Sequence, residues 1–290
     1  MGSKISNLIL SEPSDESSSF GETSEFDYTM NFINFSIPDD LLIDILSHVP
    51  ASDLIKNCRL VCKDWKSIID GHSVWKLKCK RERKNIPSIA LQNLPNHYYE
   101  KIYFHNPYGR NLIQNPCGEE GLAKWIITLN RGDGFAIENP PGGADPVPQQ
   151  VGSQSCFATT YYPCMKYQLI DLLANGICEE ILLAETTKIE IGEWFAARFD
   201  CASEYHLYVA LLDENFHDHA GTLQEYIVDD FYHEFKEEQW IGREWHPITH
   251  TFENVGRARY VYFRHDGKDR QFWAGHYGSK MTGAFVKVIA

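Results

Sequence analysis

Residues 271–278 carry the groups best suited to binding chemistry, because three aromatic rings, a histidine and two glycines occur there together. Glycine lets the backbone adopt positive φ and approach a ligand closely. Large rings on a loop cannot all face a core, so at least some of them are expected at the surface. The alternative is that Trp273 and Tyr277 fold back into the core. The preceding residues, 264–270, are expected to form a polar turn.

Two other groups of polar residues suggest different chemistry. The triplet His217, Asp218 and His219 offers metal ligands, but its polar surroundings are typical of a solvated turn. A glycosidase-like pair of carboxylates would have to come from Asp213, Glu214, Asp229 and Asp230. Nothing in the sequence places two of these on either side of a bond, so they are interpreted as surface charges.

Composition narrows the class of protein. The chain has 290 residues, of which 43% are hydrophobic and 23% charged, which suits a globular protein of one large or two smaller domains. A net charge of −13 argues against a nucleic-acid partner, because a phosphate backbone requires a basic face. There is no phosphate-binding glycine loop and no nucleophile motif, so we predict no enzyme activity and no cofactor.

The cysteines and residues 1–33 indicate in which cellular compartment the protein is expected. The eight cysteines form no CxxC pair and follow no signal segment, which predicts a reducing compartment, no zinc site and mostly buried thiols. Residues 1–6 fit the pattern for N-myristoylation at Gly2, although a chance match is equally compatible with so short a motif. Residues 1–33 are rich in Ser, Glu and Asp and are predicted to be a disordered acidic leader.

Residues 34–80 carry the pattern of short amphipathic helices. Ser36, Pro38 and Asp39 are typical of a helix start, and leucines and isoleucines then recur at helical spacing up to Val49. A second helix is predicted from Ser52 to Gly71, with a third apolar cluster around Trp75. A bundle this small is expected to dock on something.

The same stretch resembles an F-box, in its leucine- and proline-led first helix, in the run Cys58-Arg59-Leu60-Val61-Cys62-Lys63-Asp64-Trp65 and in the trailing Trp75. In that family the three-helix motif docks on the Skp adaptor of a cullin-RING ubiquitin ligase through apolar residues of the first helix and the following loop. The resemblance therefore implies a set of adaptor-binding residues: Ile37, Pro38, Leu41, Leu42, Ile45 and Leu46.

Residues 81–109 are expected to be a charged linker with further helical turns, and residues 110–290 to form a domain of short antiparallel strands. Alternation of apolar and polar residues predicts strands over 205–211, 260–265 and 284–289. Residues 171–182 are expected to pass from a strand into a short helix, and residues 229–238 to form a long acidic loop. The predicted fold is thus an α+β multidomain chain, in which a small helical motif precedes a jelly-roll-like β-sandwich.

Residues 110–290 resemble the F-box-associated domain. The resemblance rests on the opening Arg110-Asn111-Leu112-Ile113-Gln114-Asn115-Pro116-Cys117-Gly118-Glu119-Glu120-Gly121-Leu122 and on the closing stretch from Phe272 to Gly278. Sugar-recognising F-box proteins combine these two parts, and their sandwich binds N-linked high-mannose glycans through two adjacent loops. One loop of that family carries an aromatic residue and the other a Tyr-Trp-Lys triplet.

Carried over to this chain, the resemblance implies the glycan-binding residues Tyr161, Phe272, Trp273 and Ala274. Trp273 would be the ring on which a sugar stacks, and Tyr162 competes with Tyr161 for the role of the first-loop aromatic. Ala274 stands at the position of the family's lysine, which removes a donor and a charge and puts affinity and glycan preference in question.

The leading hypothesis is a non-catalytic substrate receptor of an SCF-type ubiquitin ligase, which binds high-mannose glycans on misfolded glycoproteins during ER-associated degradation. Its expected location is the cytoplasm, where the acidic leader and an acylated Gly2 could modulate its placement near the cytosolic face of the endoplasmic reticulum. Two alternatives remain open: a receptor for a non-glycan protein degron, and a glycan-binding chaperone that acts outside any ligase.

Overall fold

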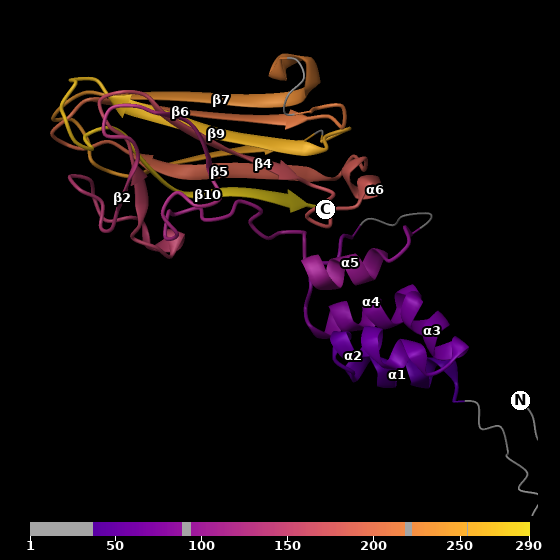
Figure 1. Ribbon diagram of the computed structural model, residues 1–290. Coiled ribbons are helices and arrows are strands. Elements are labelled where there is room, and N and C mark those ends of the chain that lie inside the picture. The colour runs from indigo at the N-terminus through magenta and orange to yellow at the C-terminus, as the bar shows by residue number, and fades with distance from the viewer. Residues whose placement is uncertain (1–36, 89–93, 218–221, 254) are drawn as a thin grey trace, which may run out of the picture. The chain divides into compact units, whose positions relative to one another are not determined.

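The computed structural model describes residues 37–88, 94–217, 222–253 and 255–290 (Figure 1). The contacts divide the chain into residues 1–38 and residues 39–290, and the second part contains every element described below. Gly2, the predicted acidic leader, and Asp218 and His219 of the predicted triplet lie outside the described residues.

Four short α-helices and one 3-10 turn follow one another in the first part of the described chain. They are α1 (Asp39–His48), α2 (Ala51–Lys56), η1 (Cys58–Leu60), α3 (Lys63–Asp70) and α4 (His72–Arg81). The prediction of one continuous second helix from Ser52 to Gly71 was wrong. Helix α2 ends at Lys56, and α3 starts afresh because the Cys62 sulfur accepts a hydrogen bond from the Trp65 backbone N–H at 3.5 Å.

The helices enclose a small core around Trp75, whose indole Nε1 donates to the carbonyl of Ile69 at 2.8 Å. A fifth helix, α5 (Tyr98–His105), lies in the segment predicted to contain further helical turns. The rings of Tyr103 and Phe104 on α5 pack at 5.4 Å and 5.5 Å from the Trp75 ring. None of these helices is long and apolar enough to cross a membrane, as far as the described residues extend.

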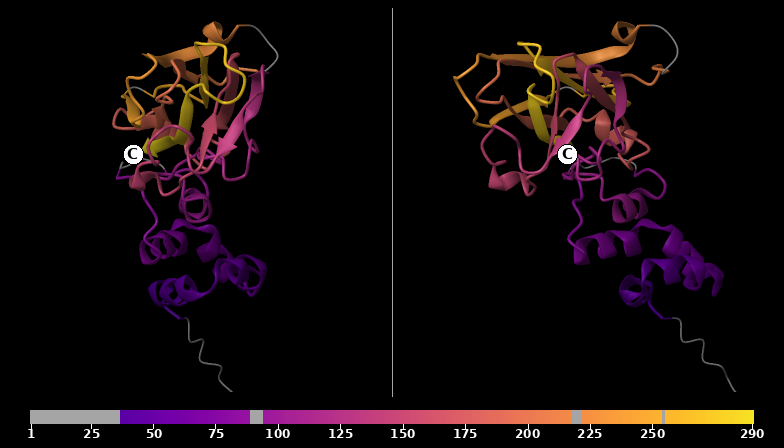
Figure 2. Two further views of the ribbon diagram at one scale, coloured as in Figure 1. Left: turned by 90° about the vertical axis from the view of Figure 1, so that its left-hand side faces the viewer. Right: turned by 60° about the vertical axis from the view of Figure 1, so that its left-hand side comes forward.

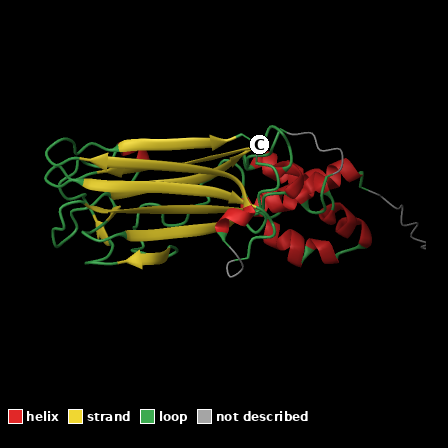
Figure 3. Ribbon diagram, turned by 90° about the horizontal axis from the view of Figure 1, so that it is seen from above, coloured by secondary structure: helices red, strands yellow, loops and turns green. Residues whose placement is uncertain are grey.

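In the part of the chain that the structure describes, ten strands form two five-stranded sheets, and Figure 3 draws these strands in yellow. The first sheet has the order β1-β4-β9-β6-β7, with β1 (Ile126–Asn130), β4 (Cys164–Asp171), β9 (Tyr260–Asp269), β6 (Ser203–Leu212) and β7 (Ile227–Glu237). The second has the order β2-β3-β10-β5-β8, with β2 (Ala136–Glu138), β3 (Cys156–Ala158), β10 (Lys280–Ile289), β5 (Lys188–Ala196) and β8 (His246–Phe252). Every neighbouring pair within the two sheets is antiparallel. The predicted combination of short helices and an antiparallel sandwich is confirmed.

The three strands predicted from alternation lie within β6, β9 and β10, and the predicted strand-to-helix passage is β4 followed by α6 (Glu179–Leu182). Short 3-10 turns occur at η2 (Gln149–Val151) and η3 (Leu223–Tyr226). All eight cysteines are free, and five of them are buried. The thiols therefore serve mainly as small core side chains, as predicted.

Two predicted loops are strands. Residues 264–269 continue β9 instead of forming a polar turn. His265 is fully buried with partners inside the sandwich, and Asp269 is fully buried where it accepts hydrogen bonds from the loop that follows. Residues 229–237 belong to β7 instead of an acidic loop. This edge strand alternates half-buried rings, such as Phe231 and Phe235, with exposed charges, a pattern that suits a sheet with one open face.

A buried polar cluster lies within the sandwich. The Lys166 ammonium is fully buried beside His265 Nε2 and lies 3.6 Å and 3.4 Å from the ring centres of Trp125 and Phe157. His265 Nδ1 lies 2.7 Å from Glu193 Oε2. Glu193 also accepts a short hydrogen bond from the Tyr205 hydroxyl, so each polar group has a partner, as buried polar groups require.

Candidate functional site

Five loops meet at one end of the sandwich. The strand register aligns Asp269 of β9 with Ser203 of β6, Ser203 with Glu237 of β7, and Lys280 of β10 with Ala158 of β3 and Ala196 of β5. The connections made there are residues 131–135, 159–163, 197–202, 238–245 and 270–279. The left-hand panel of Figure 2 looks onto this end, and we call it the loop end. It brings residues 161–162 and 272–274 to the same end of the domain.

The β9–β10 loop is shaped by Asp269 at the end of β9. Its buried carboxylate oxygen Oδ1 accepts hydrogen bonds from the backbone N–H groups of Gln271 at 3.0 Å and Phe272 at 2.7 Å. Phe272 adopts a left-handed backbone with φ +57°, which is rare for a bulky residue, and Gly275 has φ +107°. A side chain held in this conformation is turned out of the strand direction, so Asp269 fixes where the Phe272 ring points.

The two rings predicted to bind a ligand are exposed. Phe272 shows 61% and Trp273 40% of its surface to solvent, and Ala274 beside them is exposed as well. The Trp273 ring packs edge-on against Tyr277 at 5.7 Å, which leaves a face of the indole free of that contact. The alternative interpretation, in which the stretch plugs the core, does not apply to Trp273.

Several hydrogen bonds join the β9–β10 loop to its neighbours, and three of them lie around Gly275 and Gly278. The Thr160 hydroxyl donates to the Gly275 carbonyl at 2.8 Å, and the Gly275 N–H donates to Asp133 Oδ2 at 2.6 Å. The Gly278 N–H donates to the Thr159 carbonyl at 3.1 Å. A Cβ on Gly278 would lie 2.2 Å from the Thr159 hydroxyl oxygen, so only glycine permits this approach.

The β3–β4 loop supplies two tyrosines with different surroundings. Tyr162 is exposed, and its ring meets Phe272 edge-on at 5.5 Å. Tyr161 is half-buried, lies 5.3 Å from Tyr162, and packs so close to Gly132 that a Cβ there would be 3.2 Å from its ring. Tyr162 is thus the tyrosine that extends the surface formed by Phe272.

Behind Trp273, an arginine supports Tyr277. The Arg198 guanidinium lies 4.2 Å from the Tyr277 ring centre and donates two hydrogen bonds to Asp200, at 2.9 Å and 3.0 Å. These hydrogen bonds lower the pKa of Asp200. The pair thereby positions Tyr277, which in turn packs on Trp273.

The residues predicted to bind the adaptor fall into two groups. Ile37, Leu41 and Ile45 are exposed apolar side chains, and Pro38 is exposed as well. Leu42 and Leu46 are buried in the helical core, where they hold α1 in place. Of these four residues of α1, Leu41 and Ile45 are therefore accessible at the surface, and Leu42 and Leu46 are not.

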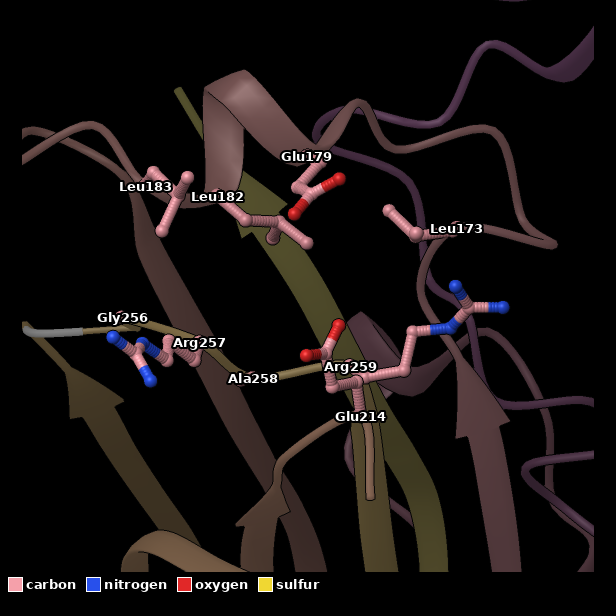
Figure 4. A pocket seen from close by; sticks show the side chains of 9 residues that line it. All are labelled: Leu173, Glu179, Leu182, Leu183, Glu214, Gly256, Arg257, Ala258 and Arg259. Atoms are coloured by element: carbon pink, nitrogen blue, oxygen red, sulfur yellow. The ribbon is translucent and has the colours of Figure 1, made fainter. Parts of the chain in front are cut away.

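A pocket of about 250 Å³ lies at the opposite end of the sandwich (Figure 4). Its wall includes Glu179 and Leu182 of α6, Glu214 after β6 and Arg257 and Arg259 before β9. Arg259 is bound to Asp171 at 2.7 Å. The pocket contains none of the residues predicted to bind glycan or adaptor, and its two glutamates offset its two arginines.

No group of three or more metal-ligating side chains occurs among the residues that the structure describes. The supporting residues Asp269, Asp133, Thr160 and Arg198 were not predicted as part of the site. Asp269 is close in sequence to the N–H groups that it binds, whereas Asp133, Thr160 and Arg198 lie far from the β9–β10 loop, 142 positions in the case of Asp133 and Gly275, so no local pattern could have shown those three.

Comparison with known proteins gives two family matches. Residues 35–81 match the model described as F-box-like, and residues 103–288 match the one described as F-box associated region. One similar relative is F-box only protein 27 of Mus musculus, which is 36% identical to this chain over 86% of this chain and 89% of the relative. Two further relatives are proteins of Homo sapiens. F-box only protein 44 is 36% identical over 87% of this chain and 95% of the relative, and F-box only protein 6 is 36% identical over 87% of this chain and 83% of the relative.

Among solved structures, one that aligns with the chain is a family 61 carbohydrate-binding module in complex with β-1,4-galactotriose. The TM-score is 0.36 at 12% identity, over 61% of this chain and 98% of that one. We infer nothing about ligands from so distant a similarity.

Proposed function

Because the chain belongs to the F-box proteins that carry an F-box-associated region, we propose that it is a substrate receptor of an SCF-type ubiquitin ligase that binds N-linked high-mannose glycans. The observation that carries the glycan part is the exposed pair Phe272 and Trp273, held at the loop end by the Asp269 carboxylate. The protein performs no chemistry itself. It brings misfolded glycoproteins close to the ubiquitin-charged enzyme, and proximity supplies the rate.

The chemistry of the loop end suits a sugar. A pyranose ring presents a flat face of C–H groups that packs on an aromatic ring, while its hydroxyls need polar partners at the rim. Trp273 would supply the ring, and Phe272 with Tyr162 would widen the apolar surface. A rigid ring provides large contact area at little cost in conformational entropy, and the edge contact with Tyr277 makes Trp273 more rigid still.

Exposed Ile37, Leu41 and Ile45 support the adaptor part of the proposal. Apolar side chains that remain at the surface of a small helical unit are typical of a docking face. The Skp adaptor and the cullin-RING core would be the stable partners, and N-glycosylated proteins the clients. The cytoplasm, including the cytosolic face of the endoplasmic reticulum, is the proposed location.

The test is calorimetry of the full chain with a high-mannose oligosaccharide that retains its chitobiose core. Wild type should release heat on binding, and Trp273→Ala should lose the binding while keeping its unfolding midpoint. Tyr232→Ala is the matched control, because Tyr232 is a ring on β7 that is more exposed than Trp273 and lies outside the loop end. No heat from a folded wild-type chain would refute the glycan proposal.

A second candidate is a receptor for a protein degron, favoured by the exposed Ala274 where the family carries lysine. In that case client binding would survive enzymatic removal of N-glycans. A third, a glycan-binding chaperone outside the ligase, would retain glycan binding and fail to bind the adaptor.

A further inference from the structure

A second group of exposed apolar side chains lies at the loop end and belongs to no predicted site. It consists of Phe199 in the β5–β6 loop and Trp240 and Ile241 in the β7–β8 loop, which show 42%, 58% and 69% of their surfaces to solvent. We call these three residues the Trp240 patch. Most exposed apolar residues of a folded protein stand singly, so three together mark a contact surface.

The patch is a built feature of the fold. Trp240 has a left-handed backbone with φ +67°, which costs free energy for a bulky residue and persists where surrounding contacts impose it. The Trp240 N–H donates to the Phe199 carbonyl at 2.8 Å, and the two rings meet edge-on at 5.5 Å. The neighbouring Gln239 amide donates to the Asp200 carbonyl at 2.9 Å. These bonds hold the two loops together with Trp240 and Phe199 turned outward.

The patch is continuous with the Trp273 site. Arg198, directly before Phe199, lies against the Tyr277 ring that supports Trp273. On the other side, Arg270 of the β9–β10 loop forms an ion pair with Glu238 of the β7–β8 loop. The Arg270 N–H also donates to the Ala202 carbonyl at 2.8 Å. One connected surface therefore runs from the proposed sugar-binding rings to the Trp240 patch.

The chemistry of the patch favours an apolar polypeptide over a second sugar. Ile241, its most exposed member, is aliphatic and offers no flat face for stacking. The arginines around it are already paired with carboxylates: Arg198 with Asp200, Arg270 with Glu238, and Arg243 with Asp145 at 2.8 Å. These ion pairs leave no unpaired charge here that would require a polar ligand, whereas apolar side chains favour contact with other apolar side chains.

We propose that the Trp240 patch binds an apolar segment of the client polypeptide beside the glycosylated asparagine. The inference rests on the proposed glycan receptor function, since an N-linked glycan at Trp273 brings the attached polypeptide to a neighbouring surface. Apolar segments are buried in folded proteins and exposed in misfolded ones. Two linked contacts strengthen each other through their high effective concentration, so the patch selects misfolded glycoproteins over folded ones carrying the same glycan.

The test compares three ligands on the full chain: a free high-mannose oligosaccharide, a reduced and alkylated glycoprotein with one such chain, and that unfolded glycoprotein after removal of its glycan. The variant is Trp240→Gly, because glycine accepts the left-handed backbone and keeps the loop. Ile241→Ser is a second variant, should Trp240→Gly alter the unfolding midpoint, and Tyr232→Ala is the control. We expect Trp240→Gly to weaken binding of the unfolded glycoprotein by about tenfold or more and to leave the oligosaccharide affinity unchanged.

Two results would overturn the proposal. If Trp240→Gly weakens the binding of both glycan-bearing ligands equally, the patch is part of the sugar site. If Trp240→Gly weakens the binding of neither, the patch does not bind the client. If wild type binds no free oligosaccharide, the proposed glycan function fails by itself. The deglycosylated unfolded chain then decides the patch: weak binding that Trp240→Gly abolishes supports it, and binding that Trp240→Gly leaves intact refutes it.

Discussion

Thr160 joins the two loops of the candidate glycan site, because its buried hydroxyl donates to the Gly275 carbonyl at 2.8 Å. The bond crosses 115 residues of sequence and links the loop that carries Tyr162 to the loop that carries Trp273. The separation between the two sets of rings therefore depends in part on this hydroxyl group, together with Asp133 on the other side of Gly275 and the bond from the Gly278 N–H to the Thr159 carbonyl.

Thr160→Val should weaken glycan binding. The substitution keeps the shape of the side chain and removes the donor, which costs about 1 kcal/mol of stability and lets the β9–β10 loop move relative to Tyr162. We expect an affinity loss of about threefold to tenfold by calorimetry. Thr282→Val is the matched control, since the Thr282 hydroxyl is also buried and donates to a carbonyl, that of Ser155 at 2.7 Å. Similar affinity losses in both variants would show that the Thr160 bond has no special role.

Ala274→Lys should strengthen glycan binding. Ala274 is exposed beside the two rings, so a lysine there would place an ammonium donor at the rim without displacing any core residue. An added hydrogen bond of this kind contributes about 1 kcal/mol, or roughly fivefold in affinity. Ala274→Met adds a side chain of similar length without the charge and serves as the control. If methionine improves binding as much as lysine, the gain comes from apolar contact and the missing charge does not limit the site.

The core of the sandwich was predictable where side chains alternate. In β6, Tyr205, Leu207 and Val209 point inward with half-buried polar or aromatic residues between them, so the periodicity of two is plain in the sequence. In β9 the same alternation continues through His265, Gly267 and Asp269, but the inward residues are no longer apolar. A strand whose buried side chains are polar cannot be told from a turn without its partners, and those partners, Glu193 and Lys166, lie about 70 and 100 positions away.

The candidate site was predictable in its rings and not in its support. Phe272 and Trp273 are conspicuous because large rings follow one another next to glycines, and the family resemblance gave them a role. Their presentation depends on Asp269, which the sequence pattern places in a polar turn, and on a left-handed backbone at Phe272 that its residue type does not favour. The exposure of Trp240 is not predictable for the same reason, because it follows from backbone conformation and loop pairing, which a sequence pattern does not carry.

Ile45→Asp should abolish binding of the Skp adaptor without unfolding the chain. The Ile45 side chain is 51% exposed on α1, so a carboxylate there stays in water in the free protein and becomes unpaired in an apolar interface. Loss of one buried contact and burial of a charge together cost several kcal/mol, a weakening of more than a hundredfold. Ile241→Asp, at an exposed isoleucine of the sandwich, is the control and should leave adaptor binding unchanged. Undiminished binding by Ile45→Asp would remove α1 from the proposed docking face.

Two histidines on adjacent strands should affect the pH dependence of stability in opposite directions. Burial lowers the pKa of His265, which faces Lys166 and Glu193 in the core. As pH falls below about 6.5, the unfolded chain takes up this proton before the folded one, so the free energy of unfolding decreases. On the outer face, the hydrogen bond to Asp266 raises the pKa of His206. The contribution of protonated His206 to the free energy of unfolding is complete below about pH 6.5, and it is lost as pH rises through the pKa of His206 in the folded chain.

Urea unfolding between about pH 7.5 and pH 5.5 tests these opposite effects. The slope of the free energy of unfolding against pH reports the difference between the numbers of protons bound by the unfolded and the folded state. His206→Gln removes the group that favours the acid side, so its stability should fall more steeply with acidification than that of wild type. His265→Gln removes the group that opposes it, so its profile should be flatter even if its overall stability is lower. Glutamine keeps hydrogen-bonding capacity at both positions, which makes the two variants controls for each other. Profiles that run parallel to wild type in both variants would show that neither histidine exchanges its proton differently on folding.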